Sequence, residues 1–272
     1  MATQTTEAVV LHSFDYLESS RIIRILTREV GLRSVLARGA KRSAKRFGAA
    51  LDLFVQGTAE LEIKPGRDLD TLSSFDVVRT RAAIGLDLAR FSGAAALSEL
   101  ILRFAQDDTD PDLFEITTDA FDRIAAGDGP VARDAAIAGA WRILAALGFE
   151  PSLDQCAECQ RDIEDDEVVL FNHASGGVIC ESCSRIARVG RKLPAGARSA
   201  IRGWLLGEDW EQGTGNREQG TRSQFPVPSS QLTDPEAKAH QRLLREFVHH
   251  HLSGGTAMKA FDAWEAGAWS AA

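Results

Sequence analysis

The chain has 272 residues, of which 44% are hydrophobic and 26% charged, and its formal net charge at pH 7 is −8. This composition is ordinary for a globular protein with a buried core, and it excludes a disordered or fibrous chain. The sequence has no window of about 18 uninterrupted apolar residues and only a short apolar run before His12, so we expect neither a membrane span nor a secretory leader and place the protein in the cytoplasm.

The charge is unevenly distributed along the chain. Residues 1–80 hold 12 Lys and Arg against 10 Asp and Glu, whereas the remainder holds 19 against 29. No acidic residue occurs between Glu29 and Asp52, and six cations fall in this gap: Arg33, Arg38, Lys41, Arg42, Lys45 and Arg46. Such a cluster on an acidic protein is typical of a polyanion-binding surface, although a short basic run alone is equally compatible with a solvated loop.

The first 80 residues predict a small β-barrel. Five segments of strand-like composition are bounded by turn residues, with no strong helical periodicity between them: 7–11, 21–27, 33–38, 55–63 and 71–78. Together they fit a closed barrel of the oligonucleotide-binding (OB) type, in which the basic run 38–46 is the loop that follows the third strand. Phe14, Tyr16 and Phe47 are candidates either for stacking against bases or for the barrel core.

Apolar residues at helical spacing begin after residue 80. They predict three helices within residues 81–150, of which the third is opened by Pro130 and closed by Gly148. Further helices in residues 191–272 complete the bundle: 197–206, 235–252 with Asp234 as its N-cap, and 256–264 from Thr256. The stretch 211–231 is rich in Gly, Gln, Ser, Thr and Pro and predicts a mobile surface loop. The expected fold class is therefore α+β, a barrel followed by a mostly helical bundle.

All four cysteines of the chain lie in residues 151–190, in two pairs with two residues between the members: Cys156, Cys159, Cys180 and Cys183. A Cys-x2-Cys turn brings both sulfurs to one tetrahedral metal ion and the second pair completes its coordination, which predicts a structural zinc (Zn2+) site. Four thiolates leave no open position for catalysis. Two disulfides or buried free thiols are the alternatives, and a reducing cytoplasm disfavours disulfides.

The segment between the cysteine pairs predicts a hairpin, with a strand at 167–171 and a turn at 172–177. Because it is polar, with five acidic residues in 162–167, we expect metal binding to supply most of its folding free energy, about 10 kcal/mol or more. His173 could replace a ligand, but we expect it to be solvated. The run 249–251 is all histidine, yet successive residues of a helix point about 100° apart and cannot converge on one ion.

The order of these features resembles the bacterial recombination mediator family RecO over nearly the whole chain. The most specific part is 9–46, where Glu18-Ser-Ser20 precedes a strand and hairpin, and Gly39-Ala-Lys-Arg-Ser43 stands in the place of the family's basic signature. The four cysteines match the zinc pairs of many members. Residues 211–231 look like an insertion, and 258–261 match the family's end only loosely.

The resemblance implies a non-enzymatic, nucleoid-associated protein of DNA repair and homologous recombination. Proteins similar to this one bind single- and double-stranded DNA, anneal complementary strands and, with the partner RecR, assist loading of the recombinase RecA onto DNA coated by single-strand-binding protein (SSB), whose tail is a further partner. The chain has no Walker phosphate loop, G-x-S-x-G or H-E-x-x-H motif. Two alternatives stay open: a zinc-ribbon protein that binds RNA in transcription or translation, and a zinc-dependent nuclease.

Overall fold

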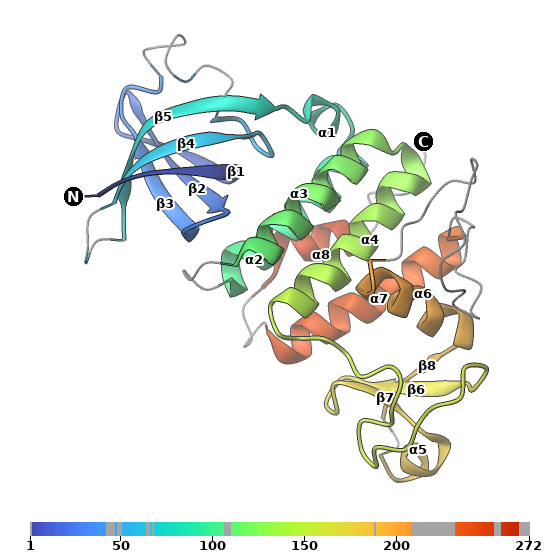
Figure 1. Cartoon of the computed structure of the whole chain (residues 1–272). Coiled ribbons are helices and arrows are strands. Elements are labelled where there is room, and N and C mark those ends of the chain that lie inside the picture. Colours follow the sequence, from blue (N-terminus) through green and yellow to red (C-terminus); the bar gives the residue numbers. More distant parts are fainter. Residues whose placement is uncertain are drawn as a thin grey trace, which may run out of the picture.

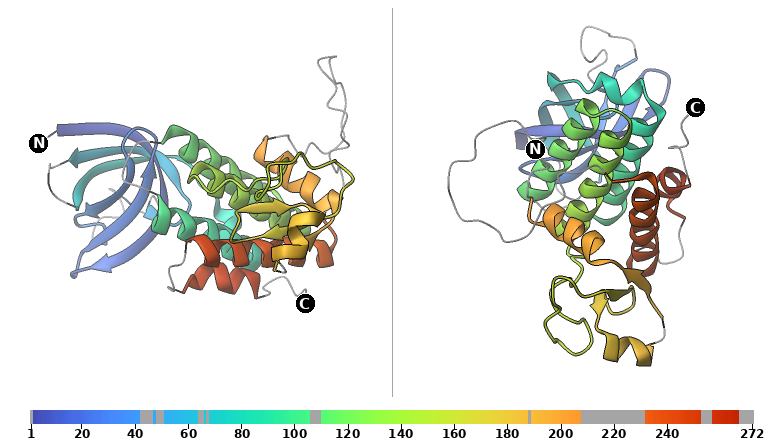
Figure 2. Two further views of the ribbon diagram at one scale, coloured as in Figure 1. Left: turned by 90° about the horizontal axis from the view of Figure 1, so that it is seen from below. Right: turned by 90° about the vertical axis from the view of Figure 1, so that its right-hand side faces the viewer.

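The structure is a computed structural model that describes residues 2–41, 47, 51–63, 66, 68–105, 110–187, 189–207, 232–252 and 257–266. It consists of a β-barrel, a helical bundle and a small module that contains the cysteines (Figure 1). The barrel and the cysteine module lie at opposite ends of the bundle (Figure 1), and the left view of Figure 2 shows the barrel at one end of the molecule. The predicted α+β fold class is confirmed. No helix in the described ranges combines the length and the apolar character that a bilayer span requires.

Five strands close the barrel in the order β1-β2-β3-β5-β4, which returns to β1: β1 Ala2–Tyr16, β2 Ser20–Thr27, β3 Gly31–Ala37, β4 Gln56–Ile63 and β5 Asp70–Arg79. Neighbouring strands are antiparallel except β3 and β5, which pair in parallel. This topology is the OB-type barrel that the sequence predicts. The first strand is much longer than the predicted 7–11, because it continues past a β-bulge after Val10.

Alternating side chains of the strands fill the barrel interior. Val10, Ile23 and Val35 are fully buried in this cluster, and Phe47 joins it with 2% of its surface exposed. Phe47 is therefore a core residue, so its alternative assignment to a base-stacking surface is wrong. Gly57 of β4 allows β5 to approach closely, because a Cβ at this position would lie 2.4 Å from the Asp76 carbonyl oxygen.

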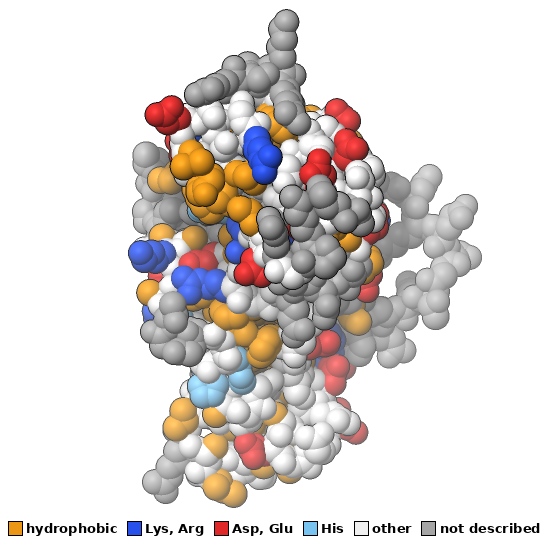
Figure 3. Space-filling view, turned by 90° about the vertical axis from the view of Figure 1, so that its left-hand side faces the viewer, with side chains coloured by type: hydrophobic (Ala, Val, Ile, Leu, Met, Phe, Trp, Pro, Cys, Tyr) orange, Lys and Arg blue, Asp and Glu red, His pale blue; other side chains and the backbone are white. Residues whose placement is uncertain are grey.

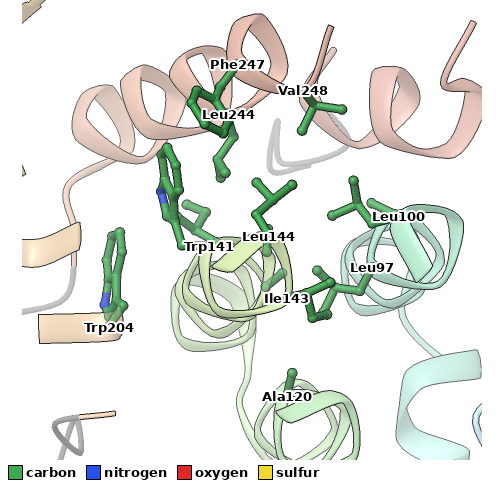
Figure 4. Packing of buried hydrophobic residues seen from close by; sticks show 14 of the residues in the cluster. Leu97, Leu100, Ala120, Trp141, Ile143, Leu144, Trp204, Leu244, Phe247 and Val248 are labelled. Carbon is green, nitrogen blue, oxygen red and sulfur yellow. The ribbon is translucent and has the colours of Figure 1, made fainter. Parts of the chain in front are cut away.

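The bundle contains three long consecutive helices and three later ones that pack on them, preceded by a short turn of helix: α1 Ala82–Gly85, α2 Leu88–Phe104, α3 Pro111–Ala126, α4 Gly129–Ala146, α6 Ala195–Leu205, α7 Asp234–His251 and α8 Lys259–Glu265. Helix α8 packs on α2, and both α6 and α7 pack on α4. Trp141 of α4 is fully buried next to Phe247 of α7, with ring centroids 5.6 Å apart (Figure 4). The C-terminal helices thus pack on the three earlier ones.

The structure corrects two helix boundaries. Helix α7 is capped by Thr233 and not by Asp234, because the Glu236 carboxylate accepts a 2.8 Å hydrogen bond from the Thr233 backbone N–H and a second one from its hydroxyl. Asp234 is the first helical residue and pairs with Arg133 at 2.6 Å. The last helix begins at Lys259. The predicted start at Thr256 and the predicted loop 211–231 lie outside the described residues.

Arg81 joins the barrel to the bundle. Its side chain is 1% exposed, and its guanidinium donates hydrogen bonds to the Phe54 carbonyl oxygen at 2.8 Å and to the Asp122 carboxylate of α3 at 2.7 Å. Burial lowers the pKa of Arg81, and the Asp122 carboxylate opposes this shift. Phe54 also packs edge-on against Phe121 of α3 at 5.1 Å. The guanidinium thus provides hydrogen bonds to the Phe54 carbonyl oxygen on the barrel side and to a carboxylate of α3 on the bundle side. These shared contacts fix the barrel on the bundle.

The cysteine module is a three-stranded sheet with a short helix: β6 Val169–Asn172, β7 Gly177–Ile179, β8 Arg191–Leu193 and α5 Glu181–Ala187. The predicted hairpin is confirmed as β6 and β7, and β8 adds a strand that the sequence analysis missed. Apolar residues of the module, including Phe171 and Val178, belong to the same buried cluster as the bundle. Burial against α4 and α7 therefore contributes to the module's stability beside metal binding, whose share of the folding free energy stays a prediction.

Candidate metal centre and nucleic-acid interface

The two cysteine pairs converge on one point of the module. All four Sγ atoms lie within 4.8 Å of one another, and those of Cys159 and Cys180 are 3.8 Å apart. The first pair sits on a tight turn that ends at Gln160, whose backbone has a φ of 60°. The second pair begins where β7 ends, and Cys183 lies in the first turn of α5. The hairpin thus brings together residues that are more than 20 positions apart in the sequence.

This geometry fits a tetrahedral zinc ion. Four sulfurs at about 2.3 Å from a central zinc would lie about 3.8 Å from one another, and the separation between Cys159 and Cys180 agrees with that value. All four cysteines are free thiols, so the alternative of two disulfides finds no support in the structure. A closed shell of four sulfurs has no open position for water or substrate, and the cluster is therefore suited to a structural metal.

Backbone N–H groups favour the thiolate form of two cysteines, whereas contacts with Cys180 and Cys159 raise the pKa of Cys183 to about 12. Burial opposes ionisation of Cys156, but N–H groups of Cys180, Cys159 and Glu158 outweigh it and lower the pKa of the Cys156 thiol to about 6. The Cys180 N–H donates to the Cys156 Sγ at 3.3 Å. The N–H of Cys183 likewise lowers the pKa of Cys180. Because thiolates are the form that binds metal, these donors prepare the site for a cation.

His173 lies outside the metal cluster and is not the solvated turn residue that we expected. Its side chain is 18% exposed and contacts the Glu246 carboxylate of α7 at 3.1 Å, and its ring packs 5.4 Å from that of Phe171. Burial lowers its pKa, and Glu246 opposes the shift. His173 therefore helps to attach the module to α7. The adjacent His251 packs against Phe247 at 4.5 Å, as expected for a structural histidine.

The six predicted DNA-binding cations are placed unequally. Arg38 and Lys41 lie together in the turn that follows β3 and are exposed. Lys41 pairs with Asp15 at 2.7 Å, whereas no ion pair is recorded for Arg38 among the described residues. Arg33 lies near the other end of β3, about 16 Å along the strand from Arg38, and its Nε donates to the Val30 carbonyl oxygen at 2.8 Å. Three of the six lie outside the described residues: Arg42, Lys45 and Arg46.

The basic turn is attached to the hairpin between β1 and β2. The Lys41 N–H donates to the Ser19 carbonyl oxygen at 3.0 Å, which places the start of the basic run beside the hairpin tip. Phe14 and Tyr16, the remaining stacking candidates, lie on that hairpin and are 45% and 40% exposed. Arg24 lies opposite His12 on the same hairpin and was not among the predicted site residues. The alternation of aromatic and polar residues from 12 to 16 was the available signal.

Comparison with known proteins places both parts of the chain in one family. Residues 1–81 match the family model "Recombination protein O N terminal", and residues 85–259 match "Recombination protein O C terminal". The chain is 34% identical over 255 residues to a protein of Anaeromyxobacter sp. named "DNA repair protein RecO", with 93% of each chain covered. Proteins of the same name from Geobacter metallireducens and a Nocardioides species are 35% and 30% identical, covering 72% and 75% of this chain and 79% and 82% of their own.

Proposed function

The chain belongs to the RecO family of DNA repair proteins, and from this premise we propose that it is a non-enzymatic recombination mediator. In this role it binds single- and double-stranded DNA through the barrel and anneals complementary strands. The observation that carries the proposal is the run of residues 30–51, which has six cations and no acid on an otherwise acidic chain. Among its described cations, Arg38 and Lys41 are exposed on the barrel.

The proposed mechanism is electrostatic. Lys and Arg side chains that neutralise phosphates release condensed counterions, which favours binding without reading the base sequence. The assigned cations are Arg33, Arg38, Lys41, Arg42, Lys45 and Arg46. Two strands whose phosphates are neutralised by one protein repel each other less, so complementary strands can pair. Because the acidic remainder of the chain repels DNA, binding is directed to the barrel.

We assign zinc to the four-cysteine cluster as a structural ion. When bound, zinc cross-links the turn at Cys156 to the start of α5 and neutralises the thiolates. The aromatic contacts of Phe171 with Trp141 and Phe247 hold the module against the bundle independently of the metal. The module therefore stabilises the helical end of the protein, while DNA binds at the barrel end.

The partners follow from the same proposal. A mediator of this family would act with RecR and with the tail of SSB, so that RecA is loaded onto DNA that SSB coats. Such a protein works at the chromosome, in the cytoplasm. The fixed joint at Arg81 supports this role, because a partner bound to the helices is then held at a constant distance from DNA on the barrel.

Annealing of two complementary labelled oligonucleotides tests the proposal. We expect the wild-type protein to accelerate annealing, and a variant with Ala at 41, 42, 45 and 46 to lose most of this effect. A matched control removes four exposed cations from the bundle and module, with Ala at 123, 185, 238 and 242, and should anneal like the wild type. Equal loss in both variants would mean that annealing depends on total charge and not on the barrel.

Two further measurements separate the alternatives. RNA that competes with single-stranded DNA better than unlabelled DNA does would favour an RNA-binding zinc-ribbon protein. Degradation of DNA by the zinc-loaded protein would establish a nuclease. We expect neither result. A nuclease is disfavoured because the four cysteines fill the metal shell and no histidine or carboxylate shares their cluster among the described residues.

A further inference from the structure

The outer face of the barrel divides into two unlike halves. Near the bundle, outward residues of β1, β2 and β3 such as Val9, Leu26 and Leu32 are buried in the same cluster as the helices. Toward the β1–β2 hairpin tip, outward residues are uncovered, and Phe14 and Tyr16 keep 45% and 40% of their surface exposed. Figure 3 views this end of the molecule and shows hydrophobic side chains gathered on the barrel with Lys and Arg side chains beside them.

A β-bulge turns the aromatic residues outward. Val10 points into the barrel and pairs with Ile25, whereas the next registered pair is His12 with Arg24, so Leu11 is an extra residue in β1. Without the bulge, His12 would share the inward face of Val10; with it, the alternation is shifted by one residue. His12, Phe14 and Tyr16, here called the aromatic row, consequently share the outer face, and the rings of His12 and Phe14 lie 5.8 Å apart.

The strand neighbours support the aromatic row. Phe14 pairs with Ile22 of β2, and Ile22 pairs with Leu36 of β3, so apolar residues of three adjacent strands share this face. Beyond Tyr16 the hairpin tip continues with Leu17, which is 75% exposed and has a φ of 52°. A large apolar residue in a left-handed conformation at a solvent-exposed tip is uncommon and is typical of functional sites.

The charges around the row favour an anionic occupant. Arg24 lies directly across from His12, has no recorded ion pair among the described residues, and its buried Nε has no hydrogen-bond partner. Arg38 follows β3 on the neighbouring strand and is also without a recorded ion pair in that part of the chain. Two acids lie on the same hairpin: Asp15, on the opposite face of β1, pairs with Lys41 at 2.7 Å and Arg21 at 3.6 Å, and Glu18 follows Leu17 in the turn.

From these observations we propose that the aromatic row is a stacking platform for the bases of single-stranded DNA, with Arg24 and Arg38 as its phosphate contacts. The inference rests on the proposed function, and adds to the basic run a second surface that binds bases and not phosphates. Exposed aromatic rings stack on any base, so the platform binds without sequence preference. Because a paired base in a duplex cannot stack on it, the platform also makes the barrel prefer single strands.

An oligonucleotide without bases tests the platform directly. Binding is measured for a thymidine oligonucleotide and for one of equal length and charge in which abasic sites replace the nucleosides. Each stacked base is expected to contribute about tenfold to affinity, so alanine at Phe14 and Tyr16 together should weaken binding of the thymidine strand about 10- to 100-fold. The abasic strand should bind both proteins equally within about twofold, since only stacking is removed.

Two controls keep the result specific. Alanine at Val77 and Val78, which are 44% and 66% exposed at the end of β5, removes apolar surface elsewhere on the barrel and should change neither affinity. Tryptophan at Phe14 and Tyr16 should retain the preference for the thymidine strand. An equal loss on both strands, or no loss on either, would overturn the platform while leaving DNA binding by the basic run intact. Absence of any binding by the wild-type protein would instead overturn the proposed function.

Discussion

Replacement of Arg81 by alanine is expected to loosen the joint between barrel and bundle. The side chain donates to the Phe54 carbonyl at 2.8 Å, to Gln56 at 2.9 Å, to Asp122 at 2.7 Å and to the Thr118 carbonyl at 3.3 Å. Its removal takes a donor from the Phe54 and Thr118 carbonyl oxygens and from the Asp122 carboxylate, which keeps Arg79 as a partner. Each such group costs about 1–3 kcal/mol, and water that enters the vacated volume recovers part of it. We therefore expect a loss of about 3–5 kcal/mol.

Arg79 provides the matched control. It pairs with the same Asp122, but its side chain is 56% exposed, so an alanine there should cost less than about 1 kcal/mol. Thermal unfolding followed by circular dichroism should show a melting temperature roughly 10 °C lower for Arg81→Ala and a nearly unchanged one for Arg79→Ala. Equal effects of the two substitutions would contradict this prediction, because the larger loss of stability is attributed to the buried hydrogen bonds of Arg81 and not to its charge alone.

Three further predictions concern the metal, the core and the barrel. Cys156→Ser should lower the amount of bound zinc, measured by metal analysis, while single-stranded DNA binding persists. An unchanged zinc content would contradict the assignment of zinc to the four-cysteine cluster. Burial lowers the pKa of His240 to about 4. Between about pH 6.5 and pH 4 the unfolded chain therefore binds the proton more readily than the folded one, so the free energy of unfolding decreases by up to about 3 kcal/mol as the pH falls. His240→Phe should flatten this pH dependence in urea titrations, and an identical slope would contradict it. Gly57→Ala should destabilise the protein strongly, because its Cβ would lie 2.4 Å from the Asp76 carbonyl oxygen; a melting temperature equal to that of the wild type would show that β5 shifts freely.

The sequence predicts the elements of the fold well because their patterns are local. Alternation in 55–63 and helical spacing after residue 80 each correspond to an observed element. The continuation of β1 to Tyr16 was missed, because a bulge shifts the alternation and hides it from a pattern with a period of two. The cap of α7 was placed one residue too late, because Thr233 and Asp234 are both good capping residues and the capping box of Thr233 with Glu236 was overlooked.

The candidate sites differ in how far the sequence predicts them. The clustering of the four cysteines could be predicted, since two Cys-x2-Cys pairs are the spacing typical of one metal site. The joint at Arg81 could not, because its partners Phe54 and Asp122 are distant in sequence and carry no motif. The contribution of Phe171 to the stability of the cysteine module could not be predicted for the same reason. The segment between the cysteine pairs is polar, and Phe171 is buried only by its contacts with α4 and α7.

The salt dependence of single-stranded DNA binding tests most directly whether the basic run of the barrel holds the DNA. For the variant with alanine at 41, 42, 45 and 46, the slope of log affinity against log salt should be shallower than that of the wild type by about 0.7 for each phosphate that the protein no longer neutralises, or roughly 3 in all. The control with alanine at 123, 185, 238 and 242 should keep the wild-type slope. If the barrel variant also keeps it, the DNA lies on another surface.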